Sequence, residues 1–417
     1  MNVRRHVTSL ARANEGSIAI VFALCITGIF GVVALAVDFA RAYNVSSKIA
    51  TALDAAALAG AKMLDGGGTD TQIQQATETY FNAHMATLRI HDTALTNFLA
   101  AIDRTKSTVT ASVKANLGTT FGRVIGRDSI DVMKSSTVNF QLRDIELAMA
   151  LDITGSMNDA NKIGDLRNAA KDVLDTLLQD ARTETSARVA LVPWSSSVNA
   201  GSLASTVSAG MSVDGCVIER TGSEAATDAV AMGGTAVGAT DAAAAPAYLC
   251  PNDPVMPLGG KSQLSSLKSV VEGFNANGGT AGHIGTAWGW YMVSPSWGAI
   301  LPSSAVPAAY NPTKTIKAVL LMSDGEFNVA YDAPNPYSTA QVDESYAKYR
   351  ALCDGMRAKK VVVYTVGFGL STGTRAETEL KYCATSPAHF FPAANGNDLK
   401  DAFRTIANQL MSLRVTK

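Results

Sequence analysis

The stretch at residues 146–157, ELAMALDITGSM, decides the fold of most of the chain. Its apolar run ends at Asp152, and Gly155 precedes a helix-like segment. An unbroken apolar run that leads through a tight turn into a helix is typical of a buried parallel strand. Asp152, Thr154 and Ser156 alternate along this turn, so their oxygens can converge above the carboxyl end of the strand, where open α/β sheets bind ligands.

Two further segments carry oxygen side chains at matching places. The apolar run at residues 318–322 is followed by Asp324 and a glycine, and a glycine turn at residues 278–279 presents Thr280 before a helix-like run. Hard divalent cations prefer oxygen donors, so these segments predict a site for Mg²⁺ (or Mn²⁺). In the alternative interpretation the hydroxyls cap a helix and Asp152 accepts backbone hydrogen bonds.

Together these pieces resemble the von Willebrand factor A fold and its metal-ion-dependent adhesion site, whose pattern is Asp-x-Ser-x-Ser, then a Thr, then an Asp. The resemblance implies five metal ligands, which are Asp152, Thr154, Ser156, Thr280 and Asp324. Thr154 stands where the family usually has serine, which keeps the hydroxyl oxygen. Thr286 is a weaker candidate than Thr280 because it falls inside the helical run. In this family the open metal position accepts a carboxylate from a protein partner, which implies binding and not turnover.

Alternating apolar strands and helices predict an α/β fold from about residue 143 to residue 417, with a doubly wound, mainly parallel sheet of the von Willebrand A type. The expected strands include 189–193, 319–322 and 361–366, and the expected helices 162–179, 346–358 and 397–413. Residues 195–261 are rich in Gly, Ala, Ser and Thr and are expected to be an insertion. This insertion leaves the carboxyl end of a strand, where it either shapes a partner's approach or only decorates a loop.

The amino-terminal region predicts a membrane anchor. Residues 1–16 carry Arg4, Arg5 and Arg12, and residues 17–37 contain no charged residue. As a helix, residues 18–37 would span about 30 Å, the thickness of the hydrocarbon core of a bilayer. The arginines predict a cytoplasmic amino terminus, a single span at residues 17–38 and an extracytoplasmic remainder. A cleaved secretory signal is the alternative.

The helix is expected to continue to the glycines at residues 66–68 and to pack on a small α+β unit, within residues 39–142. Its pattern, GSIAIVFAL at 16–24, GVVALAVDFARAY at 31–43 and LDAAALAGA at 53–61, resembles the TadE/TadG-like proteins of Flp (tight adherence) pilus assembly. The TadG branch combines this region with a von Willebrand A domain. The resemblance implies a bacterial inner-membrane protein with a periplasmic domain that binds a pilus or envelope component. A structural, pseudopilin-like role with a vestigial metal site is the alternative.

Composition and motifs argue against other classes of function. The chain has 35 Lys and Arg against 36 Asp and Glu, which does not favour a nucleic-acid binder. No GxSxG motif is present, and we expect no catalytic residue. His283 follows the glycine turn and keeps metal-dependent hydrolysis as a less favoured alternative. Trp288, Trp290 and Tyr291 are expected in the core, or otherwise in a contact surface.

Four of the five cysteines fall in the predicted extracytoplasmic part, where disulfides persist, and Cys25 lies in the apolar run. Proximity in the sequence favours the pairs Cys216–Cys250 and Cys353–Cys383. Three pairings are formally possible, and free buried thiols are a further alternative.

Overall fold

The computed structural model describes residues 16–88, 93–104, 107–139, 143–179, 181–212, 214–232, 235–239, 250–331 and 339–413. The chain divides into two compact units, Met1–Gln141 and Leu142–Lys417. The three arginines on which the predicted cytoplasmic amino terminus depends lie outside the described residues.

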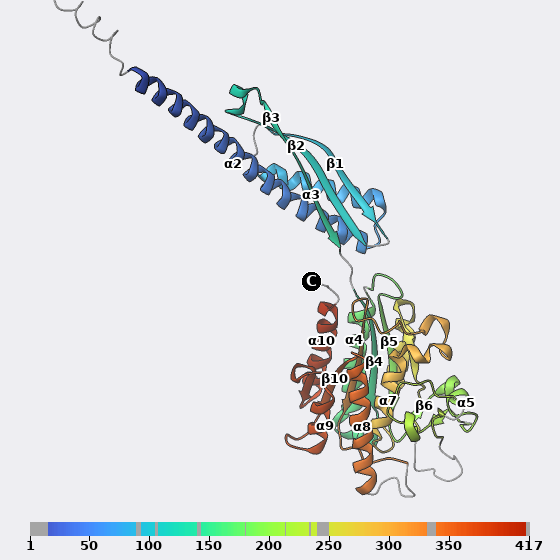
Figure 1. Ribbon diagram of the computed structural model, residues 1–417. Helices are drawn as coiled ribbons and strands as arrows, with labels where there is room; N and C mark the ends of the chain where they lie inside the picture. The colour runs from blue at the N-terminus through green and yellow to red at the C-terminus, as the bar shows by residue number, and fades with distance from the viewer. Residues whose placement is uncertain are drawn as a thin grey trace, which may run out of the picture. The chain divides into compact units, whose positions relative to one another are not determined.

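The first unit packs two helices against a small antiparallel sheet of order β1-β2-β3 (Figure 1). Its elements are α2 (Gly16–Asp65), α3 (Asp70–Thr87), β1 (Thr93–Asp103), β2 (Thr108–Gly118) and β3 (Ser129–Asn139). Along β2, buried residues alternate with half-buried ones, because successive side chains of a strand point to opposite faces. The buried face meets Ile49, Leu53 and Phe81 of the helices in one apolar core. The sequence did not predict β1, because this segment has more Ala and Leu than β-branched residues, which favour strands.

Helix α2 has two different surroundings along its length. Most of its large apolar residues from Ile20 to Val37 are exposed, whereas one side of the helix is buried by the unit from Ala42 onward. Within the described part of the chain, this is the one helix long and apolar enough to cross a membrane. An exposed apolar surface of this extent usually marks contact with a membrane or with another protein.

The second unit is built on a sheet that is parallel in its centre and mixed at one edge (Figure 1). Its parallel strands, in the order β11-β10-β9-β4-β5, are β4 (Asp144–Asp152), β5 (Ala187–Trp194), β9 (Thr315–Ser323), β10 (Val362–Phe368) and β11 (Phe390–Ala393). The insertion at residues 195–261 adds short antiparallel strands, which are β6 (Val198–Asn199), β7 (Cys216–Val217) and β8 (Met256–Gly259). Part of the predicted insertion is therefore sheet and not loop.

Helices cover both faces of this sheet. One face packs against α4 (Lys162–Leu178), α6 (Leu264–Gly273) and α10 (Gly396–Leu413), and the other against α7 (Gly282–Val293), α8 (Thr339–Ala358) and α9 (Arg375–Cys383). Leu147 and Met149 of β4 enter the first core, and Ala148 and Ala150 enter the second. A strand buried on both faces needs apolar residues at every position, which explains the unbroken run in the sequence.

Two disulfides lie in the second unit, Cys216–Cys250 in the insertion and Cys353–Cys383 between α8 and α9. Cys25 is free and exposed on α2.

The aromatic residues of α7 are buried in the core and not on a contact surface. Trp288 and Trp290 are nearly inaccessible, and Tyr291 stacks on Trp297 at 4.2 Å between ring centroids.

Candidate metal-binding site

Four of the five predicted ligands meet at the carboxyl ends of β4 and β9, which are adjacent parallel strands. The Ser156 hydroxyl donates to Asp324 Oδ1 at 2.6 Å, and the Thr154 and Ser156 hydroxyl oxygens lie 3.1 Å apart. The Thr154 backbone N–H donates to Asp152 Oδ1 at 2.9 Å. Segments that are 168 residues apart in the sequence, at Ser156 and Asp324, thus form one connected group of oxygen atoms.

The turn after β4 is shaped by its backbone. The Gly155 N–H donates to the Gly278 carbonyl at 2.9 Å, and a 3-10 helix, η2 (Gly155–Asn161), follows. Ala160 and Asn161 adopt left-handed φ values of 50° and 62° before α4 begins. Such backbone geometry is unfavourable for residues other than glycine and is common at functional sites. It turns the chain sharply, so that the amino-terminal end of α4 lies beside the acids.

The fifth predicted ligand, Thr280, is placed by its loop. Thr280 and Asn328 exchange two hydrogen bonds, from the Thr280 N–H to Asn328 Oδ1 at 2.8 Å and from the Asn328 N–H to the Thr280 carbonyl at 2.9 Å. Among the described residues, no hydrogen bond joins the Thr280 hydroxyl to the other four predicted ligands. The alternative residue, Thr286, donates its hydroxyl to the Gly282 carbonyl of its own helix at 2.7 Å.

Close packing of α7 holds this loop against the sheet. A Cβ added at Gly282 would lie 2.1 Å from the Phe327 ring, and one added at Gly285 would lie 2.4 Å from the Trp194 ring. The start of the insertion supports the same loop, because the Ser196 hydroxyl accepts the Gly279 N–H at 2.7 Å. The sequence offered no reason to single out Ser196, because this residue lies outside the spacing of the metal-ligand motif.

Lys162 and Ser323 complete the cluster. The first residue of α4, Lys162, places its ammonium 2.6 Å from Asp324 Oδ2, and the Ser323 hydroxyl donates to Asp152 Oδ2 at 2.7 Å. Burial, together with the negative charge of Asp324, raises the pKa of Asp152 to about 7, although hydrogen bonds from Thr154 and Ser323 act in the opposite direction. Sequence reasoning missed Lys162, because a lysine at the start of an amphipathic helix carries no signal of a site.

This donor set fits a hard divalent cation. Two carboxylates and the nearby hydroxyls are oxygen ligands of the kind that Mg²⁺ prefers. Within the described ranges, no group of three or more His, Cys, Asp or Glu side chains is arranged to hold a metal. A cation at this place would therefore depend on the hydroxyl oxygens as well as on Asp152 and Asp324. It would also relieve the repulsion between the two acids.

His283 belongs to a separate buried cluster. Its Nδ1 lies 2.7 Å from the Ser345 hydroxyl, and its Nε2 contacts the Glu219 carboxylate. Glu219 also accepts from Lys348 Nζ at 2.7 Å and from the Tyr331 N–H at 2.8 Å. Burial alone would raise the pKa of Glu219, but His283 and Lys348 outweigh it and lower the pKa to about 2. Both ring nitrogens of His283 thus have partners in the core. Metal-dependent hydrolysis would instead require this side chain to face the predicted metal ligands.

Comparison with known proteins gives one family match. Residues 16–63 match the family described as putative Flp pilus-assembly TadE/G-like. None of the curated proteins compared with the chain matches it significantly. The family match agrees with the resemblance seen in the amino-terminal pattern and supports a pilus-associated protein.

Several solved structures of pilus proteins are similar to the chain at low identity. The pilus adhesin SpaC from Lactobacillus rhamnosus GG matches 78% of this chain at 12% identity and a TM-score of 0.40, and the match covers 35% of SpaC. The vWF domain of the type V pili tip protein Mfa5 from Porphyromonas gingivalis matches 66% of this chain and 97% of its own length, at 12% identity and a TM-score of 0.41. The chain therefore spans about a third of the length of SpaC.

Proposed function

We propose that the chain is a membrane-anchored protein of Flp/Tad pilus assembly whose second unit binds a protein partner through a Mg²⁺-dependent adhesion site of the von Willebrand A type. The observation that carries this proposal is the hydrogen-bonded group of Asp152, Thr154, Ser156 and Asp324 at the ends of adjacent strands. Helix α2 anchors the chain in the bacterial inner membrane, with its amino terminus in the cytoplasm. The second unit lies outside the cytoplasm, a location that suits its two disulfides.

The site residues have distinct roles in this proposal. Asp152, Thr154, Ser156, Thr280 and Asp324 would hold Mg²⁺ or Mn²⁺, and the bound ion would offer a position to a carboxylate of a pilus or envelope protein. Three of the five donors are neutral hydroxyls, which donate more weakly than carboxylates, so the bound ion would stay electrophilic enough to accept a carboxylate from the partner. Lys162 has to leave Asp324 before both oxygens of that carboxylate are available.

A structural role is the second candidate, and the ion pair between Lys162 and Asp324 favours it. This pair neutralises Asp324 without a metal, as a vestigial site would require. Pilus assembly in cells that carry the Asp324→Asn variant distinguishes the partner-binding role from the structural role. We expect loss of pilus assembly if the site binds a partner, and wild-type assembly if the chain is only a pseudopilin-like component.

The direct test is calorimetric titration of Mg²⁺ and Mn²⁺ into the full chain in detergent. We expect Asp324→Asn to weaken binding by at least about 10–100-fold, the loss that follows from mutating even an outer-shell partner of a metal, because the substitution removes a charged ligand. The matched control is Asp354→Asn, which changes an exposed carboxylate paired with Arg357. Equal metal affinity in the wild type and in Asp324→Asn would contradict the proposed site, and so would a folded wild-type protein that binds neither ion, alone or with an added carboxylate.

Lys162→Met should tighten metal binding by about tenfold. The substitution removes a positive charge that competes with the cation for Asp324, and tenfold corresponds to about 1.4 kcal/mol of relieved competition. The same titration measures the effect, with Lys171→Met as the control, because Lys171 is a half-buried lysine of the same helix that pairs with Glu272 and not with a predicted ligand. Weaker binding in Lys162→Met than in the control would mean that the ammonium supports the site and does not compete with the ion.

A further inference from the structure

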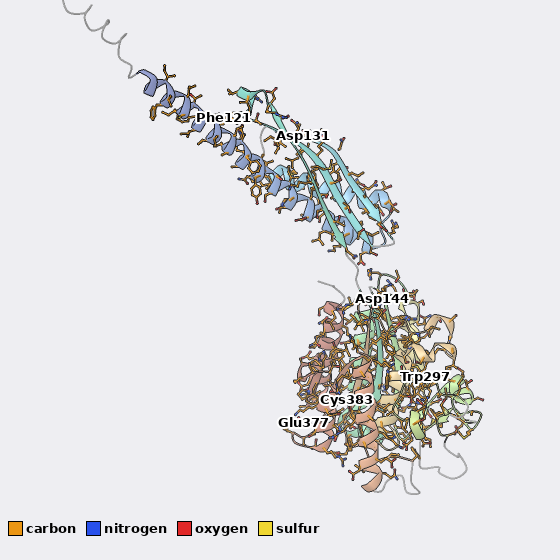
Figure 2. The ribbon with its side chains drawn as sticks, in the orientation of Figure 1. Phe121, Asp131, Asp144, Trp297, Glu377 and Cys383 are labelled. Carbon is orange, nitrogen blue, oxygen red and sulfur yellow. A yellow bond between two sulfur atoms is a disulfide. The ribbon has the colours of Figure 1, made fainter. Side chains whose placement is uncertain are left out.

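The connection between β2 and β3, residues 119–128, carries three exposed apolar side chains. We call it the β2–β3 tip. Val124 is 85% exposed, Ile125 is 62% exposed and Phe121 is 45% exposed. Figure 2 labels Phe121 beside α2, at one end of the three-stranded sheet. Apolar residues that protrude together from a loop usually mark a contact with a partner or with a membrane.

Contacts within the first unit set the level of this tip along α2. The Asp38 carboxylate accepts the backbone N–H groups of Thr120, Phe121 and Gly122 at 2.9, 2.8 and 2.7 Å. Asp38 directly follows the apolar run that ends at Val37. The tip is therefore tied to the helix at the place where its exposed apolar surface ends.

Part of the tip faces the last turn of the apolar run across a cavity of about 650 Å³. The cavity is lined by Leu35 and Ala36 of α2 on one side and by Ile125 of the tip on the other. Leu35 is itself 46% exposed. Ile125 therefore faces the last apolar turn of α2 across this cavity.

Charged and aromatic residues around the tip match the interface of a phospholipid bilayer. Arg123 and Arg127 of the tip are exposed, as is Arg41 of the helix. Phe39 and Tyr43 of α2 are 70% and 71% exposed. Arginines next to a membrane segment attract lipid phosphates, and aromatic residues gather at the boundary between hydrocarbon and water.

We propose that the β2–β3 tip is a second membrane contact, which dips its apolar residues into the outer surface of the bilayer that α2 crosses. This inference rests on the membrane anchoring in the proposed function. The tip keeps a defined shape, because the Thr119 N–H donates to the Asp128 carbonyl at 3.0 Å and the Arg127 N–H donates to the Gly122 carbonyl at 2.9 Å. With a helix and a tip both in the bilayer, the first unit is held in one orientation on the membrane instead of turning about α2.

The test uses the full chain in vesicles of phosphatidylcholine and phosphatidylglycerol, with an environment-sensitive fluorophore on one cysteine and quenchers on the lipid acyl chains. The native Cys25 reports on α2. In a Cys25→Ser background, Val124→Cys reports on the tip, and Met63→Cys is the matched control on the same helix. Met63 is 40% exposed and lies 26 residues beyond Val37, about 39 Å along the helix axis.

We expect the lipid quenchers to act on Cys25 and Val124→Cys and to leave Met63→Cys unaffected. Quenching at Cys25 without quenching at Val124→Cys would overturn the second contact while leaving the anchor intact. Absence of quenching at Cys25 would overturn the anchor and, with it, the contact of the tip. Replacing Arg123 and Arg127 with glutamate should reduce quenching at Val124→Cys several-fold in these vesicles. Unchanged quenching at Val124→Cys in this double variant would show that the two arginines do not contribute to the membrane contact.

Discussion

In metal-free buffer at about pH 8, Asp152→Asn is expected to raise the free energy of unfolding of the second unit by up to about 4 kcal/mol, since a pKa shift of one unit corresponds to 1.36 kcal/mol. Burial and the charge of Asp324 raise the pKa of Asp152 from 3.8 to about 7. The unfolded chain therefore releases this proton before the folded chain does, and the folded state loses stability as the pH rises between these two values. An asparagine carries no charge and avoids this loss.

The same substitution should remove the stabilisation that Mg²⁺ gives to the wild type, because binding to the folded state alone stabilises it. Urea unfolding at several pH values, with EDTA or with Mg²⁺, measures both effects. At about pH 4 Asp152 is protonated in the folded state, and the stabilities of the two proteins in EDTA should differ by less than about 1 kcal/mol. Asp175→Asn, which changes a half-exposed pair with Lys268, is the control and should have little effect. A loss of stability in Asp152→Asn at about pH 8 in EDTA would show that Asp152 is well paired as an anion.

Glu146→Ala is expected to lower the free energy of unfolding of the second unit by about 3–5 kcal/mol, because it leaves two buried cations without their anion. The Glu146 carboxylate contacts Arg188 and Lys317, and the three side chains are 2%, 9% and 3% exposed. It also accepts the Ala308 N–H at 2.9 Å. Burial lowers the pKa of Lys317, and Glu146 partly offsets this effect, so the lysine would be the first group to lose its charge in the variant.

Urea unfolding again gives the measurement, and Glu272→Ala gives the matched control. Glu272 pairs with Lys171, but its side chain is 63% exposed, so its removal should change stability by no more than about 0.5 kcal/mol. Combining Glu146→Ala with Lys317→Met should recover part of the lost stability, because one unpaired charge is then removed. Equal effects of Glu146→Ala and Glu272→Ala would mean that water reaches the cluster and that it is not a buried ion network.

Much of the fold was predictable because its signals are local. The unbroken apolar runs before Asp152 and Asp324 predicted strands buried on both faces, and the structure has β4 and β9 there. The expected helix up to the glycines at 66–68 is α2, which ends at Asp65. Strand β1 and the antiparallel edge strands were missed. They are short or weakly patterned and become strands only through pairing: β1 with β2, β6 and β8 with β5, and β7 with β6.

The sequence by itself determined which residues of the candidate site lie at strand ends, because the end of an apolar run and a following glycine can be read without knowing the neighbours. It did not determine what surrounds them. Only the strand order β9-β4-β5 brings Lys317 and Arg188 to the two sides of Glu146, in register with it. In the same way, only the packing of α4 places Lys162 on Asp324. Charges pair over distances of a few ångströms in space, and separation along the chain carries no information about those distances.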